Sequence, residues 1–501
     1  MSRRNLFSGS AVWRIVGQSA ILNAFRALGI GLEGRLSQMA AGSWVLAGET
    51  GNEWRLGYTG TAVGALGRWV QALGERLRGA LGGSFILDRL SVAGLLPWLL
   101  LAEPFLPTTL NVLLIWGIAG IALGRRLVRG RSLPEIPLGM PLGILAGVLV
   151  ISATGSIDPH GSLLDLVLWL SYLLLFVLVA VDIRSRRTLL RYAYLLLAGG
   201  GLVSLPGLYQ LVRGVKTSAT WVDLAHNPGL TTRIYSVFSD PNFYAMYLTL
   251  LLPLAAALLF RGGRRRRLPV AVTGLLLVAS LVYTFSRGGW VAATVALAVW
   301  VALVAPRFLC LAPLAALSIP FLPGTVRHRL ASFTNLAGSH MLHYRLLIWQ
   351  GVLPLIQRYP LTGLGLGAGS FVLAYPNTML AGIPAYHAHN LYLETLLETG
   401  LPGLAAFAYF FLSFYRLGLR GWAAVLRLGD PLTVGIAAAA VAAVSGNLFH
   451  GLEEDVWYDP HINFILWAVL GLGVAALRLL GGAGGAANAE VVGALDRNAT
   501  D

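Results

Sequence analysis

Long runs of apolar residues alternate with short polar segments from residue 90 onward. An α-helix needs about 20 mostly apolar residues to cross the roughly 30 Å hydrocarbon core of a bilayer. About twelve runs approach that length, and several of them are short or contain proline or glycine, which leaves room for one re-entrant segment. The pattern predicts an all-α, polytopic integral membrane protein with these transmembrane helices: 90–106, 109–124, 136–154, 163–183, 189–212, 241–260, 268–285, 288–304, 308–322, 391–415, 431–450 and 461–480.

Arginine-rich segments follow alternate runs: "GRRLVRGR" (124–131), "RSRRTLLR" (184–191), "RGGRRRR" (261–267) and "RLGLRGWAAVLR" (416–427). Basic loops of membrane proteins remain on the cytoplasmic side. Twelve spans with both termini inside place all four segments on that side. Two long segments then lie outside, 213–240 and, between spans 9 and 10, 323–390. Both are longer than a connector requires, so we expect function there.

The two ends of the chain differ from the apolar middle. Residues 1–89 mix arginine, glutamate and glycine with periodic apolar positions, which predicts a cytoplasmic amphipathic region on the inner leaflet, with no cleavable signal peptide. Residues 90–480 form the predicted transmembrane domain. Residues 481–501 are rich in glycine and alanine and are predicted to be a disordered tail.

Composition supports a membrane protein and excludes an ordinary soluble one. The 501 residues are 56% hydrophobic and 12% charged, with a mean hydropathy of +0.71. The net charge of +15 comes almost wholly from arginine, which clusters in short runs between apolar segments, so we predict no nucleic-acid partner. The single cysteine, Cys310, provides neither a disulfide framework nor a cysteine-based metal site.

Three arginines at the predicted outer ends of spans are candidate functional residues. Arg233 precedes "SDPN", which needs no ligand, since Asp240 or Ser239 can cap the next helix with Pro241 in its first turn. Arg233 itself has a functional and a structural interpretation, and both remain open. A cation beside hydrocarbon is costly unless it is paired or lines a wet cavity. Arg287 in "FSRGGW" fits that description, with snorkelling to lipid phosphate as the alternative.

Arg345 opens an amphipathic helix that is followed by the glycine-rich run "TGLGLGAGS". The run matches neither the P-loop nor the dinucleotide-binding fingerprint, so it is weak support for a phosphate site. "HAHN" (387–390) stands directly before an apolar helix. Neither a nearby cysteine nor an HExxH motif completes a zinc site, and we predict no metal. The positive end of the helix favours a neutral imidazole at His389, which is a competent general base.

Four stretches together resemble the O-antigen ligases and the related O-antigen polymerases and oligosaccharide transferases of bacterial surface glycans. They are "RIYSVFSDPNFYA" (233–245), "SRGGW" (286–290), "RLLIWQGVLPLIQRYPLTGLGLGAGSF" (345–371) and "HAHNLYLETLLETGLPG" (387–403). The most specific signal is a histidine followed by Asn, Ser or Gln, then nine residues and GxxG. It falls on His389, Asn390, Gly400 and Gly403. The resemblance covers about 90–480 and does not extend to the first 89 residues.

The resemblance implies a membrane glycosyltransferase of cell-envelope polysaccharide or lipopolysaccharide synthesis. It would move glycan from undecaprenyl pyrophosphate to an acceptor hydroxyl outside the plasma (bacterial inner) membrane, without metal or other cofactor. Arg287 and Arg345 match the family's essential arginines, with Arg233 a third, and they would hold the departing pyrophosphate. His389 would remove the acceptor proton, supported by His387 and Asn390 near the substrate. Arginine suits this task because its planar fork binds phosphate oxygens bidentately.

Some assignments remain open. Glu453, Glu454 and Asp455 have three possible roles: binding sugar hydroxyls, orienting a base, or keeping the loop solvated. Of these, Glu454 is our substrate-site candidate. The acceptor can be a lipid, another glycan, as in a polymerase, or a protein, as in an O-oligosaccharyltransferase. A transporter of lipid-linked glycan or of small molecules is the non-enzyme alternative, but it would carry ionisable residues near the middle of its spans, whereas the notable ones here lie at the outer ends.

Overall fold

The computed structural model describes residues 92–129, 134–216, 232–311, 324–331, 340–419 and 422–498. The chain divides into two units, Met1–Gly74 and Glu75–Asp501. The first unit lies outside the described residues, and so does the amphipathic region predicted for 1–89. The described helices all belong to the second unit.

The described residues form helices and no strand. Nine helices are long and apolar enough to span a membrane. This confirms the all-helical, polytopic class. The nine are α6 (Thr108–Val128), α8 (Pro159–Asp182), α9 (Arg186–Arg213), α10 (Pro241–Arg261), α11 (Arg267–Tyr283, with the 3₁₀ turn η2, Arg264–Arg266, before it), α12 (Arg287–Val304), α17 (Leu391–Leu419), α19 (Pro431–His450) and α20 (Pro460–Asn498).

Three of the twelve predicted spans have a different outcome. The run at 90–106 is divided into α5 (Val92–Ala102) and a 3₁₀ turn, η1 (Glu103–Phe105), and the run at 136–154 forms the short α7 (Gly139–Thr154). The run at 308–322 falls largely outside the described residues, after the 3₁₀ turn η3 (Pro306–Leu311). The count of twelve, and the placing of the large loop between spans 9 and 10, remain predictions.

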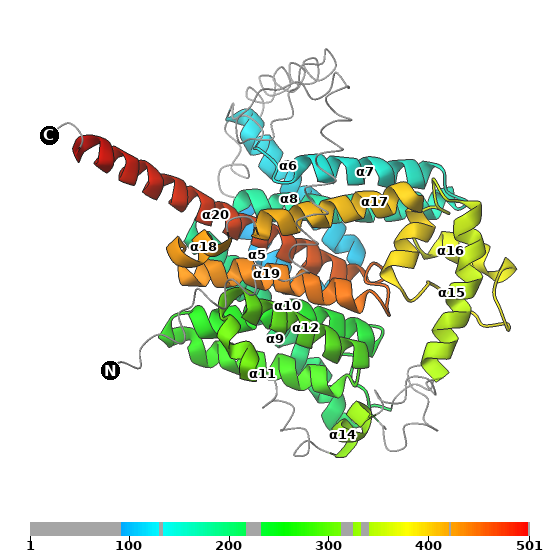
Figure 1. The fold of residues 1–501 in the computed structure, drawn as a ribbon. Coiled ribbons are helices and arrows are strands. Elements are labelled where there is room, and N and C mark those ends of the chain that lie inside the picture. The colour runs from blue at the N-terminus through cyan, green and yellow to red at the C-terminus, as the bar shows by residue number, and fades with distance from the viewer. Residues whose placement is uncertain are drawn as a thin grey trace, which may run out of the picture. The chain divides into compact units, whose positions relative to one another are not determined.

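The centre of the bundle is built from mostly buried helices with small side chains. Helix α19 packs against α10, α12 and α20, and these helices run side by side in Figure 1. Lipid is as apolar as leucine, so helices in a membrane associate through close van der Waals packing of small residues. Gly446 of α19 shows this, since a β-carbon there would come within 2.7 Å of the carbonyl oxygen of Ala292 in α12.

One end of the bundle gathers the starts of α10, α12, α17 and α20 and the end of α19. Four further elements complete this end: α14 (Gly324–Ala331), α15 (His340–Arg358), α16 (Ala368–Ala374) and η6 (Tyr375–Asn377). Helix α15 crosses the ends of the bundle helices in Figure 1. The sequence-derived candidates lie on these elements or on the loops between them.

The opposite end carries the basic segments. Arg186, which begins α9, pairs with Asp430 at 2.9 Å before α19. The guanidinium of Arg266 lies 4.6 Å from the centre of the Tyr194 ring. The short helix α18 (Trp422–Leu428) also belongs to this end, where Trp422 donates to the carbonyl of Leu303 at 2.9 Å. The separation of arginine-rich loops from the candidate residues therefore appears in the fold.

Helix α20 continues beyond the membrane-length segment Pro460–Gly481 to Asn498. The disordered tail expected for 481–501 stays a prediction. The side chains beyond Gly481 lie outside the described part of the chain.

Candidate functional site

Asn390 joins the start of α17 to the loop that follows α19. Its side-chain oxygen accepts hydrogen bonds from the backbone N–H groups of Tyr392 and Leu393, both at 3.0 Å, which is an N-cap arrangement. Its side-chain nitrogen donates to the carbonyl of Leu452 at 2.8 Å. The backbone N–H of Leu391 also donates to the carbonyl of Gly451 at 2.8 Å. Both polar groups of Asn390 are thus occupied in holding two segments together.

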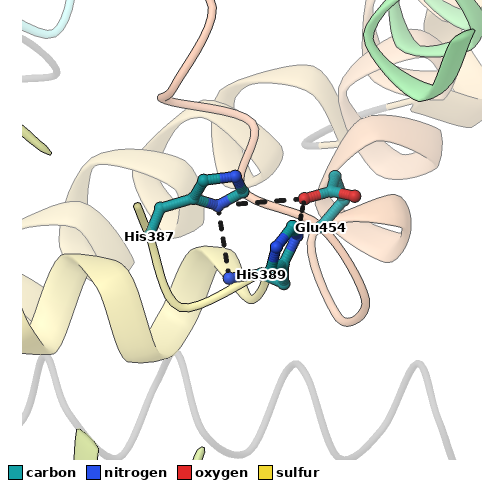
Figure 2. A group of neighbouring side chains, drawn as sticks. All are labelled: His387, His389 and Glu454. Carbon is teal, nitrogen blue, oxygen red and sulfur yellow. Dashed lines mark hydrogen bonds and ion pairs between the residues drawn. The ribbon is translucent and has the colours of Figure 1, made fainter. Parts of the chain in front are cut away.

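This connection places Glu454 against His389. Nδ1 of His389 lies 2.7 Å from Oε1 of Glu454, and Figure 2 shows both histidine rings facing that carboxylate. A carboxylate can only accept, so Nδ1 carries the proton and Nε2 keeps its lone pair. The side chain of His389 is 24% exposed and that of Glu454 is 4% exposed. A buried carboxylate therefore orients a histidine that remains reachable from outside.

His387 is the buried neighbour of this pair. Its Nδ1 accepts the backbone N–H of His389 at 3.3 Å, and its ring centre lies 4.3 Å from that of Tyr458. Burial, helped by His389, lowers the pKa of His387 to about 3. The ring is therefore neutral at physiological pH. Its 3.9 Å approach to Glu454 is a polar contact and not an ion pair.

Arg345 reaches the same carboxylate from α15. Its Nη2 lies 3.2 Å from Glu454, and its Nη1 lies 3.4 Å from Glu453. Helix α15 is held over the "HAHN" segment by two hydrogen bonds. The indole of Trp349 donates to the carbonyl of Ala388 at 2.9 Å, and the hydroxyl of Tyr344 donates to that of Pro384 at 2.9 Å.

Arg233 is buried and is connected to Glu454 through Asn242. Its Nε donates to the carbonyl of Thr284 at 2.8 Å, and its Nη2 donates to the side-chain oxygen of Asn242 at 3.2 Å. Asn242 in turn donates to Oε2 of Glu454 at 3.3 Å. Burial lowers the pKa of Arg233 to about 10, with Asp240 opposing the change, so the guanidinium stays charged at neutral pH.

Helix α10, which carries Asn242, starts as predicted. The side chain of Asp240 accepts from the backbone N–H of Asn242, and Pro241 occupies the first turn.

Arg287 begins α12, whose N-cap is Ser286. The hydroxyl of Ser286 accepts from the backbone N–H of Gly289 at 3.2 Å. Arg287 interacts electrostatically with Glu453 and Arg345 and with Arg233. The three arginines therefore gather around two glutamates at one end of the bundle. Like charges in proximity repel, so this cluster is suited to an additional anion.

Glu454 connects these groups. Burial raises the pKa of its carboxyl group, but His389, which is hydrogen-bonded to it, and Arg345 outweigh that effect and hold the pKa well below its ordinary value. The next residue shows the opposite case. Asp455 accepts from the backbone N–H of Trp457 at 2.9 Å and lacks a cationic partner among the described residues. Burial therefore raises its pKa to about 8.

The glycine-rich run packs against the rest of the fold instead of opening toward a ligand. The backbone N–H of Gly367 donates to the carboxylate of Glu398 at 2.7 Å, and that of Leu364 donates to the carbonyl of Leu397 at 2.8 Å. The carbonyl of Leu364 accepts from Ile157 at 2.9 Å. These contacts support the sequence analysis, in which this run was weak evidence for a phosphate site.

His387, His389 and Glu454 are also close enough to be considered as metal ligands. One donor atom from each lies within 4.8 Å of the others, and three ligands with an open position would suit a catalytic zinc ion. Two of the three are already engaged, because Nδ1 of His387 accepts the backbone N–H of His389 and Glu454 is paired with Arg345 and His389. The set therefore fits a metal poorly, and we route no step through one.

Sequence reasoning named most of this site and missed two connections. Asn242 bridges Arg233 to Glu454, although "SDPN" was explained entirely by helix capping. The contact from Glu454 to His389 joins residues 65 positions apart, which no local pattern encodes. The available signal was the acidic pair "EE" in a short outer loop beside a span.

The comparison with protein families was informative only for part of the chain. Residues 272–408 match the family described as O-antigen ligase. The match includes Arg287, Arg345 and His389, and it ends before Glu454. No curated protein matches the chain. The segment that carries Arg287, Arg345 and His389 is thus similar to the O-antigen ligase family.

Proposed function

We propose that the protein is a membrane glycosyltransferase that moves a glycan from undecaprenyl pyrophosphate to an acceptor hydroxyl, with His389 as general base. The observation that carries the proposal is the 2.7 Å contact between His389 and Glu454 beside three arginines. The O-antigen ligase match supports glycan transfer from a lipid-linked donor to a glycan acceptor in general terms. The specific donor, acceptor and residue roles are part of the proposal.

The reaction is a direct displacement at the anomeric carbon. Nε2 of His389 takes the proton of the acceptor hydroxyl as its oxygen attacks that carbon, and the bond from the carbon to the pyrophosphate oxygen breaks. The imidazolium that forms is stabilised by the carboxylate of Glu454, which is held ionised by its cationic neighbours. One displacement inverts the configuration at the sugar carbon.

The arginines stabilise the leaving group. Negative charge grows on the pyrophosphate as the glycosidic bond breaks, and fixed guanidinium groups placed where charge develops lower the barrier. Arg345 and Arg287 contribute directly, since Arg345 lies on α15 and Arg287 begins α12 at the site end of the bundle. Arg233 is buried and contributes through its charge and through Asn242. In this scheme His387 and Asn390 hold His389 and the loop that carries Glu454 in position.

The proposed orientation follows from the two ends of the bundle. The basic segments lie at the end opposite the site, and basic loops remain in the cytoplasm. The site therefore faces the outside of the plasma membrane. A polyprenyl-linked donor would keep its tail in the bilayer while presenting its pyrophosphate to the site at the outer surface of the membrane.

Reconstituted transfer tests the function itself. Full-length protein in detergent is given labelled glycan on undecaprenyl pyrophosphate, EDTA, and separately a lipid, a glycan and a protein acceptor. The proposal predicts product with one of the three, and the acceptor that works distinguishes ligase, polymerase and protein transferase. Wild-type product that forms without EDTA but not with EDTA would refute the metal-free mechanism. Silence with every acceptor, combined with movement of the donor across vesicles, would favour a transporter.

A further inference from the structure

Gly288, the second residue of α12, leaves a slot that the carboxylate of Glu453 fills. A β-carbon at Gly288 would overlap Oε1 of Glu453. The same carboxylate lies 3.4 Å from Nη1 of Arg345 and interacts electrostatically with Arg287. An anion thus sits at the positive end of a helix, beside two guanidinium groups.

Glu453 is a removable occupant of this slot. Its side chain is 42% exposed, whereas that of Glu454 is 4% exposed. Its contacts are also the longer ones, at 3.4 Å to the guanidinium of Arg345 and 3.9 Å to the ring of His450. An exposed side chain with long contacts can rotate into solvent at little cost, because surface ion pairs contribute little free energy.

His450 provides an independent sign of a missing ligand. It ends α19 and is 1% exposed, yet neither ring nitrogen has a hydrogen-bond partner among the described residues. Its Nε2 would lie 2.9 Å from a β-carbon on Gly288, so the ring faces the slot. Nε of Arg345 is likewise buried without a partner in the described part of the chain. Buried polar groups normally find partners, so these groups point to a ligand in the slot.

We propose that the slot over Gly288 is the subsite for a phosphate of the donor pyrophosphate, that Glu453 occupies it in the ligand-free protein, and that His450 hydrogen-bonds the phosphate once Glu453 has swung out. This inference rests on the proposed function for the identity of the ligand. It adds His450 as a substrate-binding residue and assigns Glu453 the role of an internal competitor. A ligand that must displace such a competitor binds more weakly than one that meets an empty site.

Binding of inorganic pyrophosphate to the full-length protein in detergent, followed by calorimetry at fixed ionic strength, tests the subsite. Two variants separate displacement from simple repulsion. Glu453→Gln removes the charge, whereas Glu453→Asp keeps the charge on a side chain one methylene shorter that does not reach the slot. Displacement predicts that both variants bind pyrophosphate tighter, by roughly tenfold, the order of magnitude for one charge-assisted hydrogen bond. Tightening by Gln alone would show repulsion only, and no tightening by either would overturn the role of Glu453.

His450→Phe keeps the ring volume and removes both nitrogens, and we expect about tenfold weaker pyrophosphate binding, again the scale of one hydrogen bond to a charged group. If the Phe variant fails to fold, His450→Gln, which retains a donor, replaces it, and its affinity should lie between the Phe expectation and wild type. Gly288→Ala puts a methyl group into the slot and should also weaken binding. Wild-type affinity in the His450 and Gly288 variants would overturn the subsite.

The same titrations distinguish failure of this inference from failure of the proposed function. Pyrophosphate binding needs no glycosyl transfer. The predicted affinity pattern without any transferase activity would uphold an anion subsite and reject the transferase. Transfer activity with unchanged pyrophosphate affinity in every variant would uphold the transferase and reject the subsite.

Discussion

Two glutamates that are adjacent in the chain have different surroundings at the site. Glu454 is buried and makes contacts of 2.7 Å with His389 and 3.2 Å with Arg345. Glu453 is half-buried and makes only longer contacts. The difference follows from the loop that Asn390 fixes to α17, because it turns one carboxylate toward the histidine and the other toward α12.

Glu454→Gln keeps the size of the side chain and removes its charge. We expect kcat for glycosyl transfer to fall roughly 100-fold, because the imidazolium of His389 loses its counterion. The KM for the donor should stay level or fall, since Arg345 loses a competing partner. Steady-state kinetics with varied donor give both values.

Glu135→Gln is the matched control, because Glu135 is exposed and lies outside the site. It should leave both constants unchanged. If Glu454→Gln raised KM without lowering kcat, Glu454 would be a binding residue and not the partner of a base.

Asp455 should limit stability at high pH. Burial raises its pKa from 3.8 to about 8 in the folded protein. A raised acid pKa means that the folded state holds the proton more tightly than the unfolded state does. The protonated carboxyl group therefore makes its full contribution to stability below pH 3.8, and this contribution is lost as the pH rises toward 8.

Asp455→Asn keeps an oxygen for the N–H of Trp457 and removes this penalty. The variant should melt at least a few degrees above wild type at pH 9, and the gap should shrink at pH 5. Thermal unfolding in detergent at both pH values measures it. An equal gap at both pH values would show that the buried carboxyl group does not cause the loss.

At the residue scale the sequence predicted which groups lie together at this end of the bundle better than how they connect. Charged side chains beside apolar runs are costly, which identified Arg233, Arg287 and Arg345. The links between them run through Asn242 and Glu454, which come from distant elements. Such links depend on tertiary packing and leave no local pattern.

At the scale of elements, the break in α17 explains the two glycines of the "H…GxxG" spacing. Gly400 has a φ of +65° inside the helix. A β-carbon there would come within 2.7 Å of the carbonyl oxygen of Pro360, and one on Gly403 would overlap the side chain of Thr399. The freed N–H of Leu401 donates to the carbonyl of Pro360 at 2.8 Å. The break therefore fastens α17 to the end of α15.

Gly400→Ala adds both backbone strain and a steric clash, and it should lower the free energy of unfolding by about 2 kcal/mol or more. Gly382→Ala is the matched control. Gly382 has the same φ of +65° but open space around it. It should cost about 1 kcal/mol from strain alone. Melting temperatures compare the two, and equal losses would show that the contact with Pro360 is unimportant.

Helix positions were predicted well wherever apolar runs were long. The helices are shorter than predicted at 90–106 and, by three residues, at 136–154, where the structure has α5 and α7. Pro97 lies inside α5, and Glu103 begins the 3₁₀ turn that ends it. Hydropathy sums residues without regard to such interruptions, so it overestimates the helix.

At the scale of the whole molecule, we propose that the site and the basic loops lie on opposite sides of the membrane. The chain offers its own probe, since Cys310 is its single cysteine and is exposed on η3, beyond the end of α12 that is remote from the site. In intact cells a membrane-impermeant maleimide should not label it, and permeabilisation should expose it.

Tyr386→Cys in a Cys310→Ala background is the complementary probe, because Tyr386 is 66% exposed beside the site. This variant should be labelled in intact cells. Labelling of Cys310 from outside would reverse the orientation and remove the basis for an external reaction.

Single-turnover transfer by His389→Ala tests whether His389 is the general base. Purified wild type and variant are loaded with labelled donor, and donor binding and product formation are followed separately after acceptor is added. We predict that the variant binds the donor as wild type does, because the arginines are intact, while product formation slows by roughly 100-fold or more. Wild-type product formation by His389→Ala would contradict the assignment of His389 as the base.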